Sequence, residues 1–398
     1  MNIKLSKATI CGEINAIPSK SFAHRILICD FLAGKSIRTE FNGFSSKDIL
    51  ATANCLTAIR NGQKELDCFE SGSTLRFLMP LCASIGGKFT FFGQGKLLSR
   101  PNDELFATLR EKGIVIDQTK EHIKIKGKLI NGEYKIRGDI SSQYITGLLF
   151  ALANLDGDSK IILTTPLSSK AYVDITIEVL KNYGVNIEPT EYGFFVKGNQ
   201  KFVGGFEPEG DWSNMATFLV LGAVAGDVTV KGLNLNSVQG DKQILGILKS
   251  AGAIIEQEKG KIRVKKSELN GFTFSADSCP DLVPVASVLG AVAKGKTIIK
   301  DIKRLKIKES DRVLSTISTL KAFGIKAESD GDSIVIYGGV VKGGEINSFN
   351  DHRIVMQGAI LGALSQEESK IFDASAVQKS YPTFFNDYLS VGGKAVEF

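Results

Sequence analysis

The chain has 398 residues, of which 43% are hydrophobic, and its 49 Lys and Arg against 43 Asp and Glu give a formal net charge of +6. It has no run of 18 apolar residues, which excludes a membrane-spanning helix, and its first ten residues predict a strand rather than a signal peptide. Six cysteines without a C-x-x-C pair and three scattered histidines predict reduced thiols in a cytoplasmic protein, with neither metal nor cofactor.

The first predicted helix begins in the segment I-P-S-K-S-F-A-H-R, residues 17–25. Ser19 or Ser21 can cap it, and apolar residues follow at helical spacing. Lys20 and Arg25 then lie in or near the first turn, where free N–H groups and the helix dipole already favour an anion. Cations there are unfavourable for the helix alone, so we expect this turn to bind a multiply charged anion.

The same arrangement recurs along the chain: a polar opening, an apolar helix, a Gly turn and a β-rich run. Five further openings begin at Ser71, Ser141, Ser213, Asp281 and Asp351. Between them a helix ends in Gly before a strand, at Gly113, Gly184, Gly252, Gly324 and, more loosely, at Gly392 or Gly393. Each repeat holds two helices and several strands, which is too large for a solenoid, so we interpret the chain as six βαβαββ units.

Two polar segments lie between the first and third openings. Residues 45–48, S-S-K-D, are expected to cap a second helix. Residues 93–101, G-Q-G-K-L-L-S-R-P, form a Gly-bearing loop that carries Arg100 in front of the helix-starting Pro101. The residues alone leave open whether Arg100 is a ligand-binding or a solvated arginine.

The third opening combines two hydroxyls and an amide in Ser141, Ser142 and Gln143. With the free N–H groups of a helix end these could form a phosphate cradle, although a double-Ser cap also occurs for local reasons. Tyr172 follows in S-S-K-A-Y-V-D and could cover a ring. The fourth opening has Asp211 but few cations, which is typical of plain capping.

The last two repeats carry mixed charges close to their helix openings. Residues 304–312 read R-L-K-I-K-E-S-D-R between a strand and a helix, a place where α/β folds present ligand-binding residues, although such a run is usually a solvated face. The sixth opening is N-D-H-R at residues 350–353, and its loop ends in K-S-Y-P at residues 379–382.

Taken together, the motifs resemble one family. S-K-S-x-x-H-R, S-G-S-T-L-R, S-S-Q-Y, S-K-x-Y-x-D, P-D-L, K-E-S-D-R, N-D-H-R and K-S-Y-P-x-F-F stand in this order between Pro18 and Phe385, as in the 5-enolpyruvylshikimate-3-phosphate synthase family. The resemblance implies an α/β (α+β) fold of two domains with three βαβαββ units each and an active site in the interdomain cleft. The discontinuous domain would comprise residues 1–17 and 210–398, and the inserted domain residues 18–209.

The resemblance also implies a reaction and its residues. The family transfers the enolpyruvyl group of phosphoenolpyruvate to the 5-hydroxyl of shikimate 3-phosphate and releases phosphate, a step of aromatic amino acid biosynthesis. The residues expected to hold shikimate 3-phosphate are Lys20, Ser21, Arg25, Ser141, Ser142, Gln143, Ser169, Tyr172, Asp281 and Lys308. Those expected to hold phosphoenolpyruvate are Lys20, Gly72, Arg100, Gln143, Arg312, Arg353 and Lys379.

Proton transfer is assigned through the same resemblance. Asp281 is expected to take the 5-hydroxyl proton, and Glu309 to serve carbon 3 of the enol first as donor and then as acceptor. The division of this work among Lys20, Asp281 and Glu309 stays open. Surrounding cations should hold Asp281 ionised. Glu70 and Arg304 stand where some members have Asn, which leaves local hydrogen bonds and the response to glyphosate open.

Three alternative functions fit the sequence less well. UDP-N-acetylglucosamine enolpyruvyltransferase shares the fold, but it typically has a cysteine in the loop that here, at residues 93–99, has none. An RNA 3′-phosphate cyclase would need a longer basic track with interleaved aromatic residues. A purely structural repeat protein leaves the cations at three helix openings unexplained. We therefore expect a monomer that binds two small substrates, and neither nucleic acid nor membrane.

Overall fold

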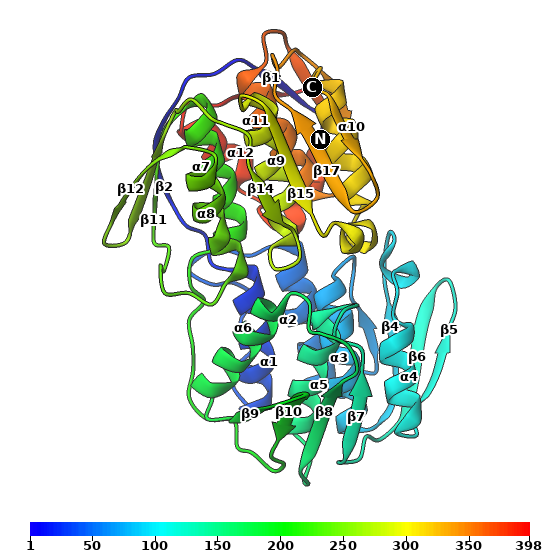
Figure 1. Cartoon of the computed structure of the whole chain (residues 1–398). Helices are drawn as coiled ribbons and strands as arrows, with labels where there is room; N and C mark the ends of the chain where they lie inside the picture. Colours follow the sequence, from blue (N-terminus) through cyan, green and yellow to red (C-terminus); the bar gives the residue numbers. More distant parts are fainter. The chain divides into compact units, whose positions relative to one another are not determined.

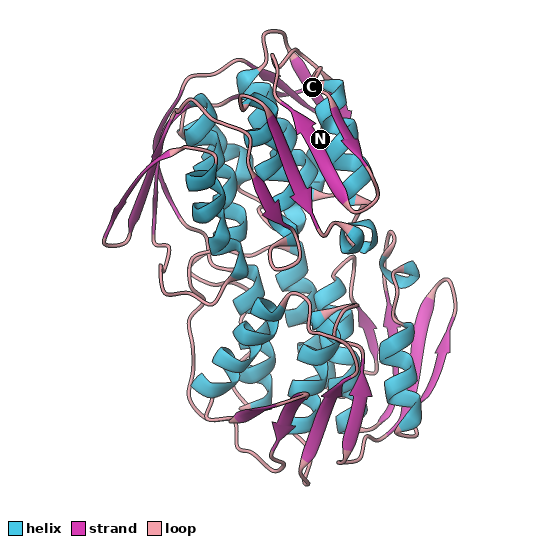
Figure 2. Cartoon of the chain, viewed as in Figure 1, coloured by secondary structure: helices cyan, strands magenta, loops and turns pink.

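The structure, a computed structural model, describes residues 1–398 and divides the chain into two compact units (Figure 1). Unit 1 comprises Met1–Ser19 and Glu209–Phe398, and unit 2 comprises Lys20–Pro208. Both units contain helices and strands (Figure 2). None of the helices combines the length and the apolar character that a membrane span requires.

Unit 2 contains two complete βαβαββ repeats and two further helices. The first complete repeat consists of β3 (Glu65–Asp67), α3 (Gly72–Ile85), β4 (Gly87–Phe92), α4 (Asp103–Glu111), β5 (Val115–Gln118) and β6 (His122–Gly127), with the short helix η1 (Leu97–Ser99). The second consists of β7 (Glu133–Ile136), α5 (Ser142–Ala153), β8 (Ser159–Leu163), α6 (Lys170–Asn182), β9 (Ile187–Thr190) and β10 (Gly193–Val196). The two further helices, at the start of the unit, are α1 (Lys20–Leu32) and α2 (Lys47–Arg60).

Unit 1 contains three complete repeats. The first consists of β2 (Ile10–Asn15), α7 (Trp212–Ala225), β11 (Gly226–Lys231), η2 (Gly240–Gln243), α8 (Ile244–Ser250), β12 (Ile254–Glu258) and β13 (Lys261–Lys265). The second consists of β14 (Thr273–Ser275), η3 (Pro280–Leu282), α9 (Val283–Val292), β15 (Lys296–Lys300), η4 (Lys303–Ile307), α10 (Arg312–Ala322), β16 (Ala327–Ser329) and β17 (Ser333–Tyr337). The third consists of β18 (Glu345–Asn347), α11 (His352–Leu364), β19 (Ser369–Phe372), η5 (Ala374–Lys379), α12 (Phe384–Ser390) and β20 (Lys394–Glu397), and β1 (Ile3–Ser6) completes its sheet.

Each of the five complete repeats forms a four-stranded sheet with the same strand order. In β3-β4-β6-β5, for example, the first two strands are parallel and the others antiparallel. The parallel pair requires a crossover, which α3 supplies, whereas β5 and β6 form a hairpin. In the last repeat β1 takes the place of the fourth strand, because it pairs antiparallel with both β19 and β20.

The first of the six expected repeats is incomplete. It provides α1 and α2, but residues 33–46 between them form only an isolated bridge between Phe41 and Phe44. The segment K-S-I-R-T-E offers one apolar side chain, too few for the buried face of a strand. Residues 201–208, at the end of unit 2, contain two glycines and a proline, which disfavour pairing.

The glycine markers end helices as expected. Gly113, Gly184, Gly252, Gly324 and Gly392 all have positive φ, between 75° and 92°. A residue in this left-handed conformation just past the last turn ends a helix at low cost only when it lacks a Cβ. The five glycines therefore end their helices with the same left-handed backbone conformation.

The cores lie around helices that are buried on every side. All residues of α7 are buried, as are nearly all of α11 and α9 in unit 1 and of α3 and α5 in unit 2. At Gly147, α5 approaches α3 so closely that a Cβ would lie 2.4 Å from the carbonyl oxygen of Arg76. This contact fixes the two helix openings relative to each other.

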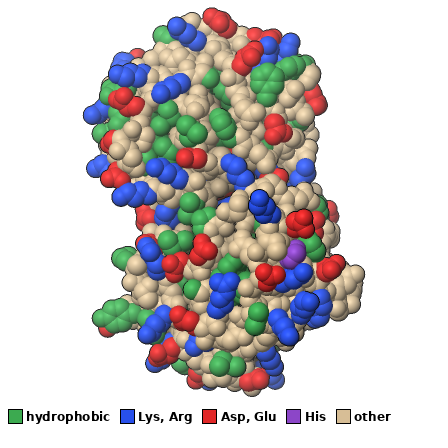
Figure 3. Space-filling view, turned by 90° about the vertical axis from the view of Figure 1, so that its right-hand side faces the viewer, with side chains coloured by type: hydrophobic (Ala, Val, Ile, Leu, Met, Phe, Trp, Pro, Cys, Tyr) green, Lys and Arg blue, Asp and Glu red, His purple; other side chains and the backbone are tan.

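The surface carries both signs of charge. On the face that Figure 3 shows, Lys and Arg side chains are interspersed with Asp and Glu, and hydrophobic side chains occur in scattered groups. A continuous basic track of the kind that follows a nucleic acid backbone is absent from this face.

Candidate functional site

In unit 2, helix α1 begins at Lys20, so the first turn carries the cations that the sequence predicts there. Lys20 Nζ donates to Asp48 Oδ2 at 2.8 Å, in the first turn of α2. Ser46 caps α2 as expected, because its hydroxyl accepts from the backbone N–H of Ile49. The sequence left open whether Ser19 or Ser21 caps α1, and Ser19 does not cap it, because its buried hydroxyl makes no hydrogen bond.

Arg25 is a fully buried cation. Its guanidinium donates to Thr176 Oγ1 at 2.8 Å, to the Tyr172 carbonyl at 2.8 Å and to the Ser21 carbonyl at 2.6 Å, all of them neutral oxygens. Burial lowers the pKa of Arg25 to about 9, which still leaves it charged at neutral pH. A buried cation held by neutral groups gains strongly from a bound anion. This arrangement is the physical basis for an anion site beside the first turn of α1.

The other residues expected to bind shikimate 3-phosphate lie at the openings of α5 and α6. Ser141 caps α5 and accepts from the backbone N–H of Gln143, and Ser142 is the first residue of that helix. Ser169 precedes α6 in the left-handed conformation, with φ of 52°. The carbonyl of Tyr172 on α6 joins this opening to Arg25 on α1.

The unit 2 residues expected to bind phosphoenolpyruvate lie around the opening of α3. A Cβ at Gly72 would lie 2.8 Å from Nη1 of Arg100, so the Arg100 guanidinium covers the backbone of this glycine. Gln143 on α5 donates to Ser73 at 3.0 Å and accepts from Arg76 at 2.7 Å. The structure therefore brings Gly72, Arg100 and Gln143 together, from three separate segments.

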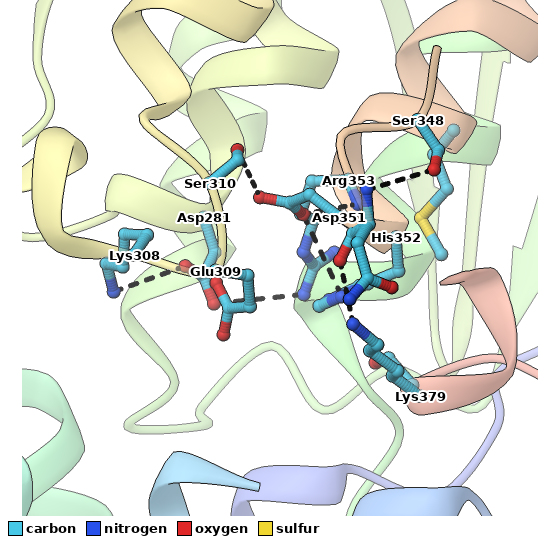
Figure 4. Close-up of polar contacts among 12 residues, drawn as sticks. Asp281, Lys308, Glu309, Ser310, Ser348, Asp351, His352, Arg353 and Lys379 are labelled. Carbon is cyan, nitrogen blue, oxygen red and sulfur yellow. Dashed lines mark hydrogen bonds and ion pairs between the residues drawn. The ribbon is translucent and has the colours of Figure 1, made fainter. Parts of the chain in front are cut away.

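In unit 1, the centre of the site is Arg312, which is the first residue of α10. Its side chain is almost fully buried. Its guanidinium donates to Asp281 Oδ1 at 2.6 Å, to Glu309 Oε2 at 2.7 Å and to Asp351 Oδ2 at 2.8 Å. Figure 4 shows Asp281, Lys308 and Glu309 gathered beside Asp351 and Arg353. One cation thus holds both carboxylates to which proton transfer is assigned.

Asp281 lies among cations. Burial would raise the pKa of its carboxyl, but Lys308, Arg312 and Arg353 outweigh burial and hold this pKa well below its ordinary value. Lys308 Nζ is 3.5 Å and Arg353 Nη2 is 3.9 Å from the Asp281 carboxylate. This direction agrees with the expectation that cations keep Asp281 ionised. Burial in turn lowers the pKa of Lys308.

Arg353 and Lys379 complete the unit 1 cluster. Arg353, in the first turn of α11, donates to the Ser213 carbonyl at 2.8 Å and also to the Ser213 hydroxyl. Lys379, at the end of η5, donates to the carbonyl of Asn350 at 2.8 Å (Figure 4). Three helix openings, those of α7, α10 and α11, therefore contribute to one cationic cluster with three carboxylates.

The structure adds three residues that the sequence reasoning did not assign to the site. Asp48 accepts from Lys20, Arg76 contacts Gln143, and Asp351 accepts from Arg312 and from Ser310 Oγ at 3.0 Å. Asp351 and Arg76 stood inside motifs already recognised, N-D-H-R and S-G-S-T-L-R. Gln143 is 67 residues from Arg76 and Arg312 is 39 residues from Asp351, so no local pattern reveals these two contacts.

The expected site residues fall into two sets. The set in unit 2 comprises Lys20, Ser21, Arg25, Gly72, Arg100, Ser141, Ser142, Gln143, Ser169 and Tyr172, and the set in unit 1 comprises Asp281, Lys308, Glu309, Arg312, Arg353 and Lys379. The contacts above join members within each set. No group of three or more His, Cys, Asp or Glu is placed to hold a metal ion.

Comparison with known proteins gives a consistent result. A family model described as EPSP synthase (3-phosphoshikimate 1-carboxyvinyltransferase) matches residues 60–388. The 3-phosphoshikimate 1-carboxyvinyltransferase of Clostridium kluyveri is 40% identical over 420 residues, covering 100% of this chain and 98% of the relative. That of Clostridium novyi is 40% identical over 425 residues and covers 98% of both.

Two solved structures resemble the fold. An EPSP synthase from Acinetobacter baumannii has a TM-score of 0.79 at 23% identity and covers 100% of both chains. The enolpyruvyl transferase NikO from Streptomyces tendae has a TM-score of 0.77 at 14% identity and covers 99% of this chain and 98% of its own. At these identities the likeness shows the fold alone, and it confirms the fold class expected from the sequence.

Proposed function

Because this chain belongs to the EPSP synthase family of 3-phosphoshikimate 1-carboxyvinyltransferases, we propose which of its residues carry out the family's reaction. The reaction transfers the enolpyruvyl group of phosphoenolpyruvate to the 5-hydroxyl group of shikimate 3-phosphate and releases phosphate. Both substrates carry a phosphate and a carboxylate, so the protein must supply several cations and hydrogen-bond donors.

In the proposed addition step, Asp281 takes the proton of the 5-hydroxyl group while the oxygen of that hydroxyl group attacks carbon 2 of phosphoenolpyruvate. Glu309 gives a proton to carbon 3, and a tetrahedral ketal forms. In the elimination step the phosphate leaves, carbon 3 returns its proton to Glu309, and Asp281 returns its own to the phosphate. Lys20 is the third candidate for proton transfer.

The observation that carries this proposal is the shared contact of Asp281 and Glu309 with Arg312. Because one buried guanidinium holds both carboxylates, an acid and a base have fixed relative positions, as a reaction with two proton transfers requires. Lys308 and Arg353, near Asp281, supply positive charge for phosphate and carboxylate groups. The four hydrogen bonds that Arg312 already makes leave one N–H for phosphoenolpyruvate.

Substrate binding is divided between the two sets. We assign shikimate 3-phosphate to Lys20, Ser21, Arg25, Ser141, Ser142, Gln143, Ser169, Tyr172, Asp281 and Lys308. We assign phosphoenolpyruvate to Lys20, Gly72, Arg100, Gln143, Arg312, Arg353 and Lys379. Buried Arg25, with its neutral partners, supports the first assignment, and the Arg100 guanidinium over Gly72 supports the second.

We propose further that the protein acts as a monomer in the cytoplasm. Its six cysteines are free thiols, five of them buried, which suits a reducing compartment. Each set of substrate-binding residues is supplied by this chain alone, so the proposed chemistry needs no residue from a second copy.

The proposal is tested by measuring phosphate release from phosphoenolpyruvate with shikimate 3-phosphate as acceptor. UDP-N-acetylglucosamine is the control acceptor, since the sister enzyme uses it. We expect phosphate release and a new enolpyruvyl ether only with shikimate 3-phosphate. Release with the nucleotide sugar alone would contradict the assignment of the acceptor.

A further inference from the structure

Arg76 lies where three segments of unit 2 meet, yet none of the proposed roles uses it. It is the fifth residue of α3, and only 5% of its surface is exposed. Its guanidinium donates to Asn102 Oδ1 at 3.0 Å, to the Pro101 carbonyl at 2.9 Å and to Gln143 Oε1 at 2.7 Å. The carbon Cζ of the same guanidinium lies 5.5 Å from the centre of the Tyr144 ring.

The contact with Gln143 fixes which atom of its amide faces outward. A guanidinium only donates hydrogen bonds, so the Gln143 oxygen must face Arg76 and its nitrogen must point away. That nitrogen donates one hydrogen to Ser73 Oγ at 3.0 Å, which leaves the second for another acceptor. Without Arg76, the amide would be free to turn its oxygen toward an incoming anion.

The other two contacts hold the segment that carries Arg100. Asn102, which accepts from Arg76, donates in turn to the Arg100 carbonyl at 3.0 Å. The Pro101 carbonyl accepts both from Arg76 and from the Tyr144 hydroxyl. The backbone at Arg100 and directly after it is therefore tied to α3 and α5, and the Arg100 guanidinium lies over Gly72.

We propose that Arg76 is a positioning residue for phosphoenolpyruvate: it orients the Gln143 amide and fixes the Arg100 backbone without contacting substrate itself. The inference rests on the binding roles proposed above for Gln143 and Arg100. Its physical basis is the planar fork of the guanidinium, which serves three acceptors in fixed directions, as a lysine ammonium cannot.

The test begins with the Arg76→Met and Arg76→Lys variants and the value of kcat/KM for phosphoenolpyruvate. We expect both to fall about a hundredfold, as for a displacement of binding groups by about 1 Å. Arg110→Met is the matched control, because Arg110 also lies beside an aromatic ring and donates to a carbonyl, that of Ile116, and it should keep wild-type activity. Full activity of Arg76→Lys would show that charge alone matters and would overturn the proposal.

A mutant cycle separates positioning from direct contact. In the Asn102→Ala/Gln143→Ala background the side chains through which Arg76 acts are gone, so adding Arg76→Met should lower kcat/KM by less than about tenfold. An undiminished hundredfold loss would mean that Arg76 does not act through these two side chains, and it would overturn the proposal. If the wild-type protein shows no transfer at all, the proposed function fails instead.

Amide hydrogen exchange of the free protein gives a readout that does not depend on activity. Arg76→Met should raise the exchange of the backbone amides in the segment 97–103, apart from Pro101, which has none, at least about tenfold, because their anchor on α3 is lost. Amides in the second half of α4 serve as the internal reference and should not change. Equal exchange of residues 97–103 in the wild type and the variant would contradict the proposed anchoring.

Discussion

At the scale of single residues, Glu309 offers a direct test of the proposed chemistry. Its carboxylate is held by Arg312 at 2.7 Å and remains partly exposed. Glu309→Gln keeps the shape of the side chain, and its amide oxygen can still accept from Arg312, but the amide cannot give or take the proton of carbon 3. We expect turnover to fall at least about a hundredfold while the dissociation constant of shikimate 3-phosphate changes little, which steady-state kinetics and calorimetric titration can measure.

A matched control for this variant is Glu345→Gln. Glu345 also pairs with one cation, Lys370, but in an exposed pair at the edge of a sheet. Removing its charge should leave turnover unchanged. Near-wild-type turnover of Glu309→Gln, with its product confirmed, would remove Glu309 from the mechanism.

Single residues also show what could be predicted from the sequence. The cations Lys20 and Arg25 were predicted to lie at a helix opening, because capping and apolar spacing are local patterns. The partners of these cations could not be predicted in this way. Thr176, which accepts from Arg25, is 151 residues distant, and only the packing of α1 against α6 brings the two together.

At the scale of elements, a buried chain of side chains joins α1, α2 and α3. His24 Nδ1 is 2.7 Å from Thr52 Oγ1, which is 2.7 Å from Thr74 Oγ1, and Thr74 donates to Ser71 Oγ at the cap of α3. Each hydroxyl has one proton to give, so Thr52 must donate to Thr74 and His24 Nδ1–H must donate to Thr52. The Nε2 atom of His24 is buried and has no hydrogen-bond partner, so a second proton there would have no acceptor, which favours the neutral ring.

This chain of hydrogen-bonded side chains predicts that the stability of the protein depends on pH. Burial lowers the pKa of His24 well below its ordinary value, and nearby Lys20 and Arg25 add to this effect. In the unfolded chain the same histidine has a pKa of about 6.5. As the pH falls below about 6.5, the unfolded state binds a proton that the folded state does not, so the free energy of unfolding decreases by about 1.4 kcal/mol per pH unit.

Urea unfolding of the wild type and of His24→Asn between pH 8 and pH 5 measures this contribution. Asn can still donate to Thr52 but does not titrate. The free energy of unfolding of the wild type, relative to that of His24→Asn, should therefore fall by about 1.4 kcal/mol per pH unit below about pH 6.5. The control is His122→Gln, because His122 lies at the start of β6 and is not part of these hydrogen-bonded side chains. It should retain the wild-type slope. Parallel curves for the wild type and His24→Asn would mean that His24 binds its proton over the same pH range in the folded and the unfolded protein.

Elements were predicted best where the signal is local. The glycines that end helices and the openings at Ser46, Ser141, Asp211 and Asp351 were predicted from residue type and spacing, and they serve those roles. The first repeat was not predicted correctly, because its helices follow the pattern while the residues between them lack the apolar alternation of a strand. Repeat counting could not detect this loss, since the helices alone carried the pattern.

At the scale of the whole molecule, the proposal requires that residues of both units bind one substrate. Shikimate 3-phosphate is assigned to Arg25, Ser141 and Ser169 in unit 2 and also to Asp281 and Lys308 in unit 1. The sequence predicted this division through family resemblance only, because no spacing relates residues so far apart. A ligand that contacts both sets must affect both units, whatever their arrangement without it.

Hydrogen exchange with shikimate 3-phosphate alone tests this requirement, since no turnover occurs without phosphoenolpyruvate. At a concentration of shikimate 3-phosphate a hundred times its dissociation constant, binding raises the free energy of unfolding by about 2.7 kcal/mol, which slows the exchange of protected amides about a hundredfold. We expect such protection in residues 20–25, 141–146 and 168–176 of unit 2 and in residues 279–284 and 303–312 of unit 1. Shikimate without its phosphate should protect far less, because Arg25 then lacks its anion, and the edge strand β12 should not respond. Protection confined to unit 2 would remove Asp281 and Lys308 from the binding site, and with them the proposed base.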